Sequence, residues 1–365
     1  MSKAVFGVGL IGVTPGRSWA AVAHIPALQA LPGFRVAALS TTRMESARKA
    51  ADAFGVDLAF DNHEDLVNAK EVDLVAVTVK VPHHRELVTA ALEAGKHVYC
   101  EWPLGNGLAE AEEMAALARK KGVKAFVGLQ ARSSPVVARV KDLVADGYVG
   151  DVLSTTLVGS GMNWGAFIDQ PNAYTADKRN GATLLSIPVG HTVDALCHCL
   201  GEFVAIDAML ANRRKTFTLL PDGTTLPMTA EDQVLVAGEL QGGAVASIHY
   251  RGGISRGTNL LWEINGSEGD LQITSIGGHA QMFELTLKGA RGEETLETLS
   301  IPASYTTTPE VGPFSRNVAE AYARAYRDLT EGTNLCPDFD AAVTRHRFLD
   351  AVEKAAAEGR RQHLD

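Results

Sequence analysis

The sequence predicts an α/β Rossmann domain followed by an α+β domain with a large, mainly antiparallel open sheet. In the first third, short apolar runs alternate with helical segments, which is typical of a parallel sheet with crossover helices. After residue 151, long strand-like runs are separated by turns, as in antiparallel sheets. The 365 residues exceed what one core usually serves, so we expect domains at 1–130 and 131–365. The C-terminal helices are expected to pack back toward the first domain.

The elements of the first domain can be placed by their apolar patterns. Residues 5–13 are continuously apolar, as in a strand that is covered on both faces. Further strands are expected at 34–40, 72–79, 97–101 and 124–129. Helices are expected at 44–54, 84–94 and 108–121, each ending at or near a glycine, the usual stop signal.

The second domain is expected to contain long strands and a few helices. Strand signals occupy 232–250, 259–275 and 281–288, and helical patterns occupy 134–145, 183–200, 315–330 and 338–357. The pair Gly242-Gly243 predicts a hairpin turn. Because the outer face of an open sheet needs a cover, we expect a homodimer or homotetramer.

Composition argues against several classes of partner. The formal net charge of −9 disfavours nucleic acid. The four cysteines show no C-x-x-C spacing and are expected to be reduced, and no apolar stretch is long enough to span a membrane. The N-terminus lacks the basic region and cleavage site of a signal peptide. We therefore expect a cytoplasmic protein without nucleic-acid or membrane partners.

A partial glycine loop follows the first strand. A Rossmann turn needs glycine where the backbone approaches the pyrophosphate. Residues 7–12 spell G-x-G-x-x-G inside the apolar run, but we place the turn after Gly12, with Gly16 serving after a one-residue change. Cofactor contacts are expected at Gly9, Gly12, Thr14 and Gly16. The alternative is a tight turn that binds nothing.

The end of the second strand bears on the choice of cofactor. An acidic residue there would hold the ribose hydroxyls of NAD, but the chain continues from Ser40 through two threonines to Arg43. The sequence therefore favours NADP slightly over NAD, with Ser40 and Arg43 at the cofactor. Alternatively, Arg43 is a solvated residue in the first turn of the next helix.

The segment ALEAGKHVYCEWPL at 91–104 resembles the A-L-E-A-G-K-H-V-x-x-E-K-P signature of the glucose–fructose oxidoreductase and inositol dehydrogenase (Gfo/Idh/MocA) family. The resemblance extends to 127–132, 190–194 and 264–270, and so covers nearly the whole chain. It implies that the chain binds NAD or NADP and oxidises or reduces a carbon of a sugar-like or polyol molecule.

The chain departs from the family pattern at two positions. The family's lysine is Trp102, and its aspartate is Ser186, with one extra residue before His191. These departures resemble a subgroup that includes the fungal galactose-pathway repressor, which binds a transcription activator and a dinucleotide. Two functions therefore stay open: an NAD(P)-dependent oxidoreductase, and a catalytically silent dinucleotide-binding regulator with a protein partner.

Three residues are candidates for the chemistry. Hydride transfer needs a group that takes the hydroxyl proton, and the resemblance assigns this role to His191. Asp194 shares the helix face of His191 and can orient the imidazole. Lys80 follows a parallel strand and can supply the charge that Trp102 lacks. The alternatives are a core histidine and a surface lysine; a metal is not expected from one histidine–aspartate pair.

The remaining site residues are assigned by the resemblance and by their positions. Further cofactor contacts are expected at Thr78, His84, Glu101, Trp102, Pro103 and Gln130. Substrate contacts are expected at Arg132, Trp164 and Tyr174. The two aromatic rings can stack on a sugar, and burial in the core is the alternative.

Overall fold

The computed structural model describes residues 5–364, which divide into two compact units. Unit 1 comprises the chain up to Ser133 together with Thr307–Thr344, and unit 2 comprises Ser134–Thr306 and the chain from Arg345 on. The division after Ser133 lies close to the expected boundary at 130. The second unit differs from the expected 131–365, because residues 307–344 have most of their contacts within unit 1.

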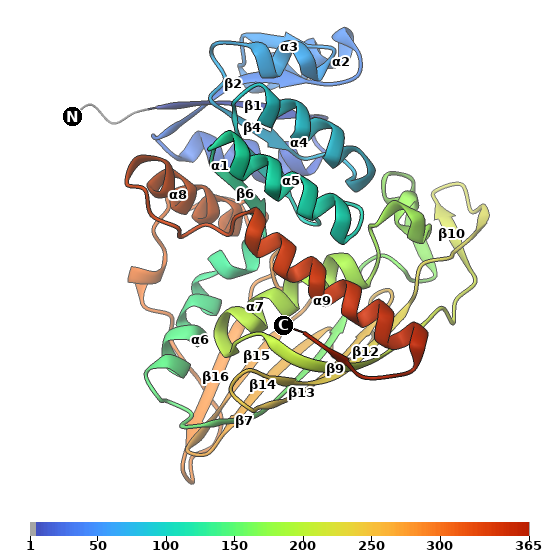
Figure 1. Ribbon diagram of the computed structural model, residues 1–365, viewed down its shortest axis with the longest axis vertical. Coiled ribbons are helices and arrows are strands. Elements are labelled where there is room, and N and C mark those ends of the chain that lie inside the picture. The colour runs from blue at the N-terminus through green and yellow to red at the C-terminus, as the bar shows by residue number, and fades with distance from the viewer. Residues whose placement is uncertain (1–4, 365) are drawn as a thin grey trace. The chain divides into compact units, whose positions relative to one another are not determined.

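Unit 1 is built on a six-stranded sheet in the order β3-β2-β1-β4-β5-β6 (Figure 1). Every pair in this sheet is parallel, which confirms the predicted Rossmann half. The strands are β1 (Phe6–Ile11), β2 (Phe34–Ser40), β3 (Leu58–Phe60), β4 (Leu74–Val77), β5 (His97–Glu101) and β6 (Ala125–Gly128). Only β3 has no counterpart among the expected strands, because three residues carry too little pattern.

Unit 1 also contains helices and one-turn elements. They are α1 (Ile25–Ala30), α2 (Met44–Phe54), α3 (His63–Asn68), α4 (His84–Glu93), α5 (Leu108–Lys121) and α8 (Arg316–Thr330), with one-turn elements η1 (Ala20–His24), η2 (Val81–His83) and η3 (Gln130–Ser133). Helices α2 and α5 end at Gly55 and Gly122, which adopt φ of 67° and 66°. The left-handed conformation suits glycine, so these residues stop the helices as expected.

Helix α8 belongs to the core of unit 1. Its residues Val318, Ala321 and Tyr322 are buried in one apolar cluster with residues of β1, α1 and β2. The Tyr322 ring lies 5.5 Å from that of Phe34. This packing explains why a segment from the C-terminal part of the chain belongs to the first unit.

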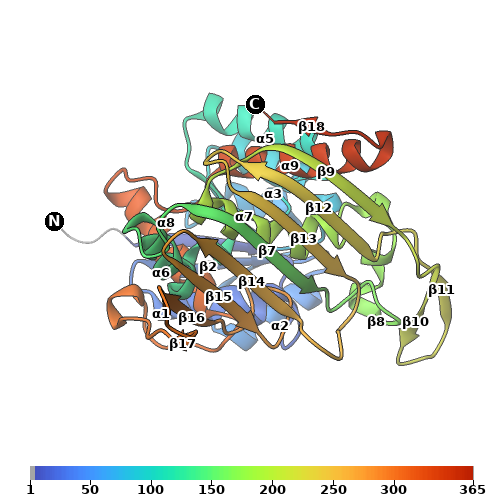
Figure 2. The same ribbon diagram turned by 90° about the horizontal axis from the view of Figure 1, so that it is seen from below.

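Unit 2 is built on a nine-stranded sheet in the order β17-β16-β15-β14-β7-β13-β12-β9-β18, whose main strands Figure 2 shows side by side. The strands are β7 (Val152–Ser160), β9 (Phe203–Ala211), β12 (Gln233–Leu240), β13 (Val245–Arg251), β14 (Leu260–Gly266), β15 (Gly269–Ser275), β16 (Thr286–Arg291), β17 (Glu297–Thr298) and β18 (Gln362–His363). Only β7 and β13 pair in parallel, which confirms a mainly antiparallel sheet.

The predicted hairpin at Gly242-Gly243 joins β12 and β13. Its turn is closed by the amide of Leu240, which donates to the carbonyl of Ala244 at 2.9 Å. A smaller sheet contains β8 (Phe167–Asp169), β10 (Thr216–Leu220) and β11 (Thr225–Pro227). The helices of this part are α6 (Pro135–Ala145), α7 (Gly190–Leu200) and the portion of α9 (Phe339–Glu358) from Arg345 on. The short helical elements are η4 (Gln170–Ala176), η5 (Lys178–Asn180), η6 (Leu185–Val189) and η7 (Ala303–Tyr305).

Between residues 5 and 364, the structure contains no helix long and apolar enough to cross a membrane.

Candidate functional site

A cavity of about 530 Å³ opens at the carboxyl ends of β1, β2, β3 and β4 in unit 1. Its lining residues are Ile11, Gly12, Val13, Thr14, Ser40, Thr41, Thr42, Ser46, Asp61, Asn62, His63, Glu64, Val79, His83, Glu86 and Leu87. The sheet order places β2 on one side of β1 and β4 on the other, so the strand order reverses here. Ligands of open parallel sheets bind at such a switch point.

Gly12 forms the turn at the centre of this edge. Its φ of 95° is left-handed, and a Cβ there would lie 2.5 Å from Cγ1 of Val79. The Gly12 amide donates to the Ser40 carbonyl at 2.9 Å, so the turn is anchored to the end of β2. Only glycine adopts this backbone conformation without strain. Because glycine has no side chain, a ligand can also approach the backbone closely here. Placing the turn after Gly12 is therefore confirmed.

The other residues of the expected loop divide into two groups. Thr14 lines the cavity, and its amide donates to Oγ of Ser18 at 2.9 Å. Gly9 does not line the cavity, because it lies inside β1 with Leu66 and Val72 against it. Gly16 is also absent from the lining, and nothing lies within 4 Å of where its Cβ would be. The expected contacts at Gly9 and Gly16 therefore have no support in the cavity.

The end of β2 differs from the expectation at Arg43. Ser40 lines the cavity as expected, and its Oγ donates to the Asn62 carbonyl at 2.9 Å. Arg43 is exposed and outside the lining, and its carbonyl accepts hydrogen bonds from Thr41 Oγ1 and Ser46 Oγ. Acidic residues of the β3–α3 segment lie on the wall instead. These acidic residues were not among the expected contacts, because neither β3 nor α3 was expected.

Past β4, two of the expected residues take different places. Thr78 is buried, and its Oγ1 donates to the Ile11 carbonyl at 2.8 Å, which joins the ends of β4 and β1. Lys80 is exposed and precedes η2. The cavity lining includes Val79 and His83 but neither Thr78 nor Lys80. Thr78 therefore holds the ends of β1 and β4 together without lining the cavity itself.

Glu101 lies at the centre of a buried polar network in unit 1. Gln130 Nε2 donates to both of its carboxylate oxygens, at 2.7 and 2.8 Å, and His24 Nε2 lies 3.0 Å from Oε1. The other imidazole nitrogen of His24 lies 2.8 Å from the hydroxyl of Tyr322. Because these groups occupy its carboxylate, Glu101 is held in one position and is a poor candidate for moving protons itself.

His84 is a structural residue rather than an open contact. It is buried, with Nδ1 2.9 Å from the Pro103 carbonyl and Nε2 3.0 Å from the Val79 carbonyl. Burial lowers the pKa of its imidazole despite these carbonyls. His84 thus ties the end of β4 to the segment after β5, which corrects the expected role at the cofactor. Trp102 is buried as well, so an indole fills the position of the family's lysine.

In unit 2, the extra residue before His191 is accommodated in a π-turn. Residues 185–189 form η6, which continues directly into α7. Ser186 Oγ donates to the Gly181 carbonyl at 2.7 Å and accepts from the Thr183 amide at 2.8 Å. Single π-turns are often found at functional sites. The serine in place of the family's aspartate stabilises this turn locally.

His191 is buried at the start of α7. Desolvation and the charge of the neighbouring His279 lower its pKa to about 3, against the opposing effect of Asp194. The Nδ1 of His191 has no hydrogen-bond partner within the described part of the chain. Burial also lowers the pKa of His279 to about 4, and its Nε2 accepts from the Met162 amide at 3.4 Å. Sequence reasoning missed His279, which has no motif around it.

Asp194 lies in a buried ion-pair network. Arg345 Nε lies 3.5 Å from the Asp194 carboxylate, and Arg345 Nη2 donates to both oxygens of Glu202 at 2.9 Å. Arg345 and Asp194 are fully buried, while Glu202 is partly exposed. Asp194 therefore compensates Arg345, and its effect on His191 is the electrostatic one described above.

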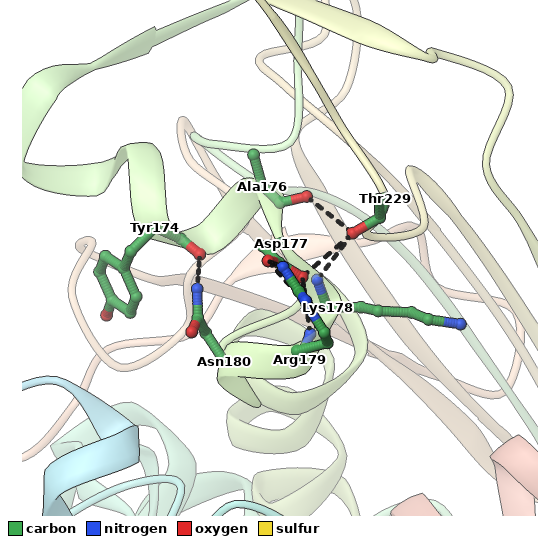
Figure 3. Close-up of polar contacts among 7 residues, drawn as sticks. All are labelled: Tyr174, Ala176, Asp177, Lys178, Arg179, Asn180 and Thr229. Carbon is green, nitrogen blue, oxygen red and sulfur yellow. Dashed lines mark hydrogen bonds and ion pairs between the residues drawn. The ribbon is translucent and has the colours of Figure 1, made fainter.

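Of the three residues expected to contact the substrate, Trp164 does not fit that role. It is fully buried at a φ of 60°, and its indole N–H donates to the Thr175 carbonyl at 3.1 Å, so it belongs to the core. Tyr174 is half-buried, with its ring directed away from the polar cluster in Figure 3. Arg132 lies in η3, and its carbonyl accepts from Arg324 Nη1 at 2.9 Å.

The cluster in Figure 3 fixes the segment that carries Tyr174. Asn180 Nδ2 donates to the Tyr174 carbonyl at 2.7 Å, and Arg179 pairs with Asp177. The hydrogen bonds from Arg179 lower the pKa of Asp177 to about 2. Thr229, distant in the sequence, also bonds to Asp177 and to the Ala176 carbonyl, and the cluster is partly exposed. We therefore interpret the cluster as a loop anchor.

Among residues 5–364, no group of three or more histidine, cysteine or acidic side chains is placed to hold a metal ion.

Two family models match the chain. The model "Oxidoreductase family, NAD-binding Rossmann fold" matches residues 6–129, and the model "Gal80p, C-terminal domain" matches residues 135–275. The chain is 32% identical over 346 residues to the dehydrogenase aclE of Aspergillus oryzae, covering 89% of this chain and 88% of that one. It is 26% identical over 388 residues to the levoglucosan dehydrogenase of Pseudarthrobacter phenanthrenivorans, covering 98% and 96%.

A solved structure is similar over nearly the same length. The transcriptional regulator Gal80p from Kluyveromyces lactis superimposes with a TM-score of 0.87 at 28% identity, over 99% of this chain and 92% of that one. A solved levoglucosan dehydrogenase also superimposes, with a TM-score of 0.86 at 22% identity, so a dehydrogenase and a regulator share this fold.

Proposed function

The chain belongs to the Gfo/Idh/MocA oxidoreductase family, in its Gal80-like subgroup, and on that premise we propose that it binds a nicotinamide dinucleotide at the cavity of unit 1. We propose further that it transfers a hydride between the nicotinamide and a carbon of a sugar-like or polyol molecule. Of the two relatives, aclE is named a dehydrogenase, and the other is named a dehydrogenase of levoglucosan.

The observation that carries the proposal is the turn at Gly12. A glycine with positive φ at a sheet edge has no side chain over its backbone, so a pyrophosphate can approach that backbone closely. Gly12 and Thr14 would hold the pyrophosphate, and Ser40 and Thr42 would face the adenosine ribose. The volume of about 530 Å³ lies within the roughly 300–1,000 Å³ of small-molecule sites. When bound, the dinucleotide supplies the hydride acceptor or donor.

For the chemistry, the proposal assigns proton transfer to His191. The support is geometric: Nδ1 of His191 has no hydrogen-bond partner within the described residues, so this ring nitrogen is available to a substrate hydroxyl. Lys80 supplies a positive charge in place of the lysine that is Trp102 here. Under this proposal, Lys80→Ala lowers kcat by about tenfold or more, and undiminished turnover would remove Lys80 from the mechanism.

A second function has its own support. Trp102 is buried and Ser186 stabilises a turn, so neither replaces the chemistry of the family's lysine and aspartate. These residues favour a dinucleotide-binding regulator that acts through a protein partner, as the likeness to the regulator Gal80p also suggests.

One experiment separates the two functions. Thermal unfolding is followed with NADH and NADPH, and nicotinamide absorbance is then followed with a panel of sugars and polyols. A higher melting temperature with a dinucleotide, together with turnover of a sugar or polyol, supports the oxidoreductase. The variant His191→Ala should then be inactive. Stabilisation without turnover on any substrate favours the regulator, and a protein partner should then be sought.

The outer face of the large sheet supports a homo-oligomer. Met209 of β9 and Leu235 of β12 are 62% and 37% exposed, beside a shallow hollow of about 380 Å³ over β7, β9, β12 and β13. A second copy would cover these apolar residues. Met209→Glu should then shift the mass measured by light scattering toward the monomer. A cytoplasmic location stays a prediction.

A further inference from the structure

Strand β2 lacks the acidic residue that usually selects NAD. In Rossmann folds, a carboxylate about 20 residues after the glycine loop accepts hydrogen bonds from the ribose hydroxyls. Here β2 ends at Ser40, and the next residues are Thr41 and Thr42, which line the cavity without carrying a charge.

The register of β3 brings a carboxylate to the same level. Ser40 pairs with Phe60 across the parallel β2–β3 ladder, and the Thr41 amide donates to the Phe60 carbonyl at 3.1 Å. Asp61, the residue after Phe60, therefore lies beside Thr41, one strand away from the usual position. The Ser40–Asn62 hydrogen bond holds the two chain segments together at this level.

Asp61 is exposed and lines the cavity. Its Oδ1 accepts a hydrogen bond from Asn62 Nδ2 at 3.1 Å. A carboxylate has about four acceptor sites, so capacity remains for ribose hydroxyls.

The charges on the cavity wall support the same conclusion. Asp61, Glu64 and Glu86 line the cavity, and the residues described along its wall include no lysine or arginine. Glu64 is partly engaged, because His63 Nδ1 lies 3.4 Å from its Oε2. The 2′-phosphate of NADP would bring up to two negative charges close to these carboxylates, and such charges repel within a Debye length of about 8 Å.

We propose that this chain selects NAD(H) over NADP(H), with Asp61 of the β3–α3 segment serving in place of the acidic residue absent from β2. The inference rests on the proposed dinucleotide site. It reverses the slight preference for NADP that the sequence suggested, because Arg43 is outside the cavity wall and acidic residues are on it.

The test is a titration of the full chain with NADH and with NADPH, followed by nicotinamide fluorescence. The wild type should bind NADH at least about tenfold more tightly than NADPH. The double variant Asp61→Asn/Glu64→Gln should narrow this ratio to about threefold or less, chiefly by tightening NADPH. Asp57→Asn is the matched control: it removes an exposed carboxylate just before β3 that does not line the cavity, and it should leave the ratio unchanged.

The outcomes separate this inference from the proposed function. Equal or tighter binding of NADPH by the wild type would overturn the inference and leave the dinucleotide site standing. An unchanged ratio in the double variant would also overturn it, because other residues would then discriminate. Binding of neither NADH nor NADPH by the wild type would contradict the proposed function itself.

Discussion

The cavity edge of unit 1 and the surroundings of His191 in unit 2 place their polar residues in opposite ways. In unit 1, the polar residues at the sheet edge line an open cavity of about 530 Å³. In unit 2, His191, Asp194 and Arg345 are buried, and the charges of Asp194 and Arg345 compensate each other. The first arrangement is suited to exchanging water for a ligand. The second is expensive to disturb, because a buried charge without a partner is strongly destabilising.

The difference shows what each family position contributes here. The turn proposed to bind the cofactor depends on backbone geometry, which Gly12 provides through its positive φ. The candidate acid–base residue depends on its surroundings, and burial holds the His191 imidazole neutral. The proposed binding role and the proposed proton-transfer role therefore rest on different units, and variants in the two units should have different effects.

The largest effect is expected for the buried ion pairs of unit 2. Arg345→Leu leaves Asp194 buried without its partner, so the free energy of unfolding should fall by about 3–5 kcal/mol. The control is Arg361→Leu, because Arg361 and its partners Asp207 and Glu239 are about half exposed. That change should cost less than about 1 kcal/mol. Urea unfolding, with separate probes for the two units, measures both; equal losses would contradict the assigned role of burial.

A smaller effect is expected at the cofactor turn. Gly12→Ala adds a Cβ at 2.5 Å from Val79 Cγ1 in a left-handed backbone, which should cost about 2–3 kcal/mol and weaken NADH binding at least tenfold. Gly16→Ala is the control: its φ is 77°, but no atom lies near the added Cβ, so about 1 kcal/mol is expected. Calorimetry with NADH distinguishes them. A Gly12→Ala variant that binds as the wild type does would remove Gly12 from the site.

The pH dependence of stability tests the buried histidines. The pKa values of His191 and His279 fall to about 3 and about 4, whereas an unfolded histidine titrates near 6.5. Above about pH 6.5 both states are neutral and these residues add no pH dependence. Below it the unfolded state binds protons that the folded state excludes, so stability falls as the pH falls toward 4.

On the order of 1–2 kcal/mol should be lost per histidine between about pH 7 and about pH 5. His279→Gln should flatten this dependence, whereas His363→Gln, at an exposed position, should preserve it. Urea unfolding at the two pH values measures the loss. A wild type equally stable at both would show that these imidazoles are not shielded from protonation.

Much of the fold was readable from the sequence. Long apolar runs with glycine stops predicted β1, β2 and α5 within a few residues, and Gly242-Gly243 predicted the hairpin. Strand β3, with three half-buried residues, left no pattern to detect. Segment 307–344 was expected to belong to the second domain, with its helices packing back toward the first. Its apolar residues do pack against β1 and β2, and local pattern does not encode how far such long-range contacts extend.

The candidate site was readable only in part. The turn at Gly12 could be predicted because few residues other than glycine tolerate a positive φ. The burial of Trp164 and His84 could not be read, since an aromatic or imidazole ring suits a core as well as a ligand. Asp61 was missed for a different reason: its place beside Thr41 depends on the β2–β3 register.

The central claim is that the Gly12 cavity binds a nicotinamide dinucleotide, and calorimetric titration of the purified wild-type chain with NADH tests it most directly. We expect one site per chain with micromolar or tighter affinity and a negative heat-capacity change from burial of the ligand's apolar surface. The melting temperature should rise as well, since a ligand at a hundred times its Kd stabilises the fold by about 2.7 kcal/mol. Absence of heat and of any thermal shift at millimolar NADH would contradict the claim.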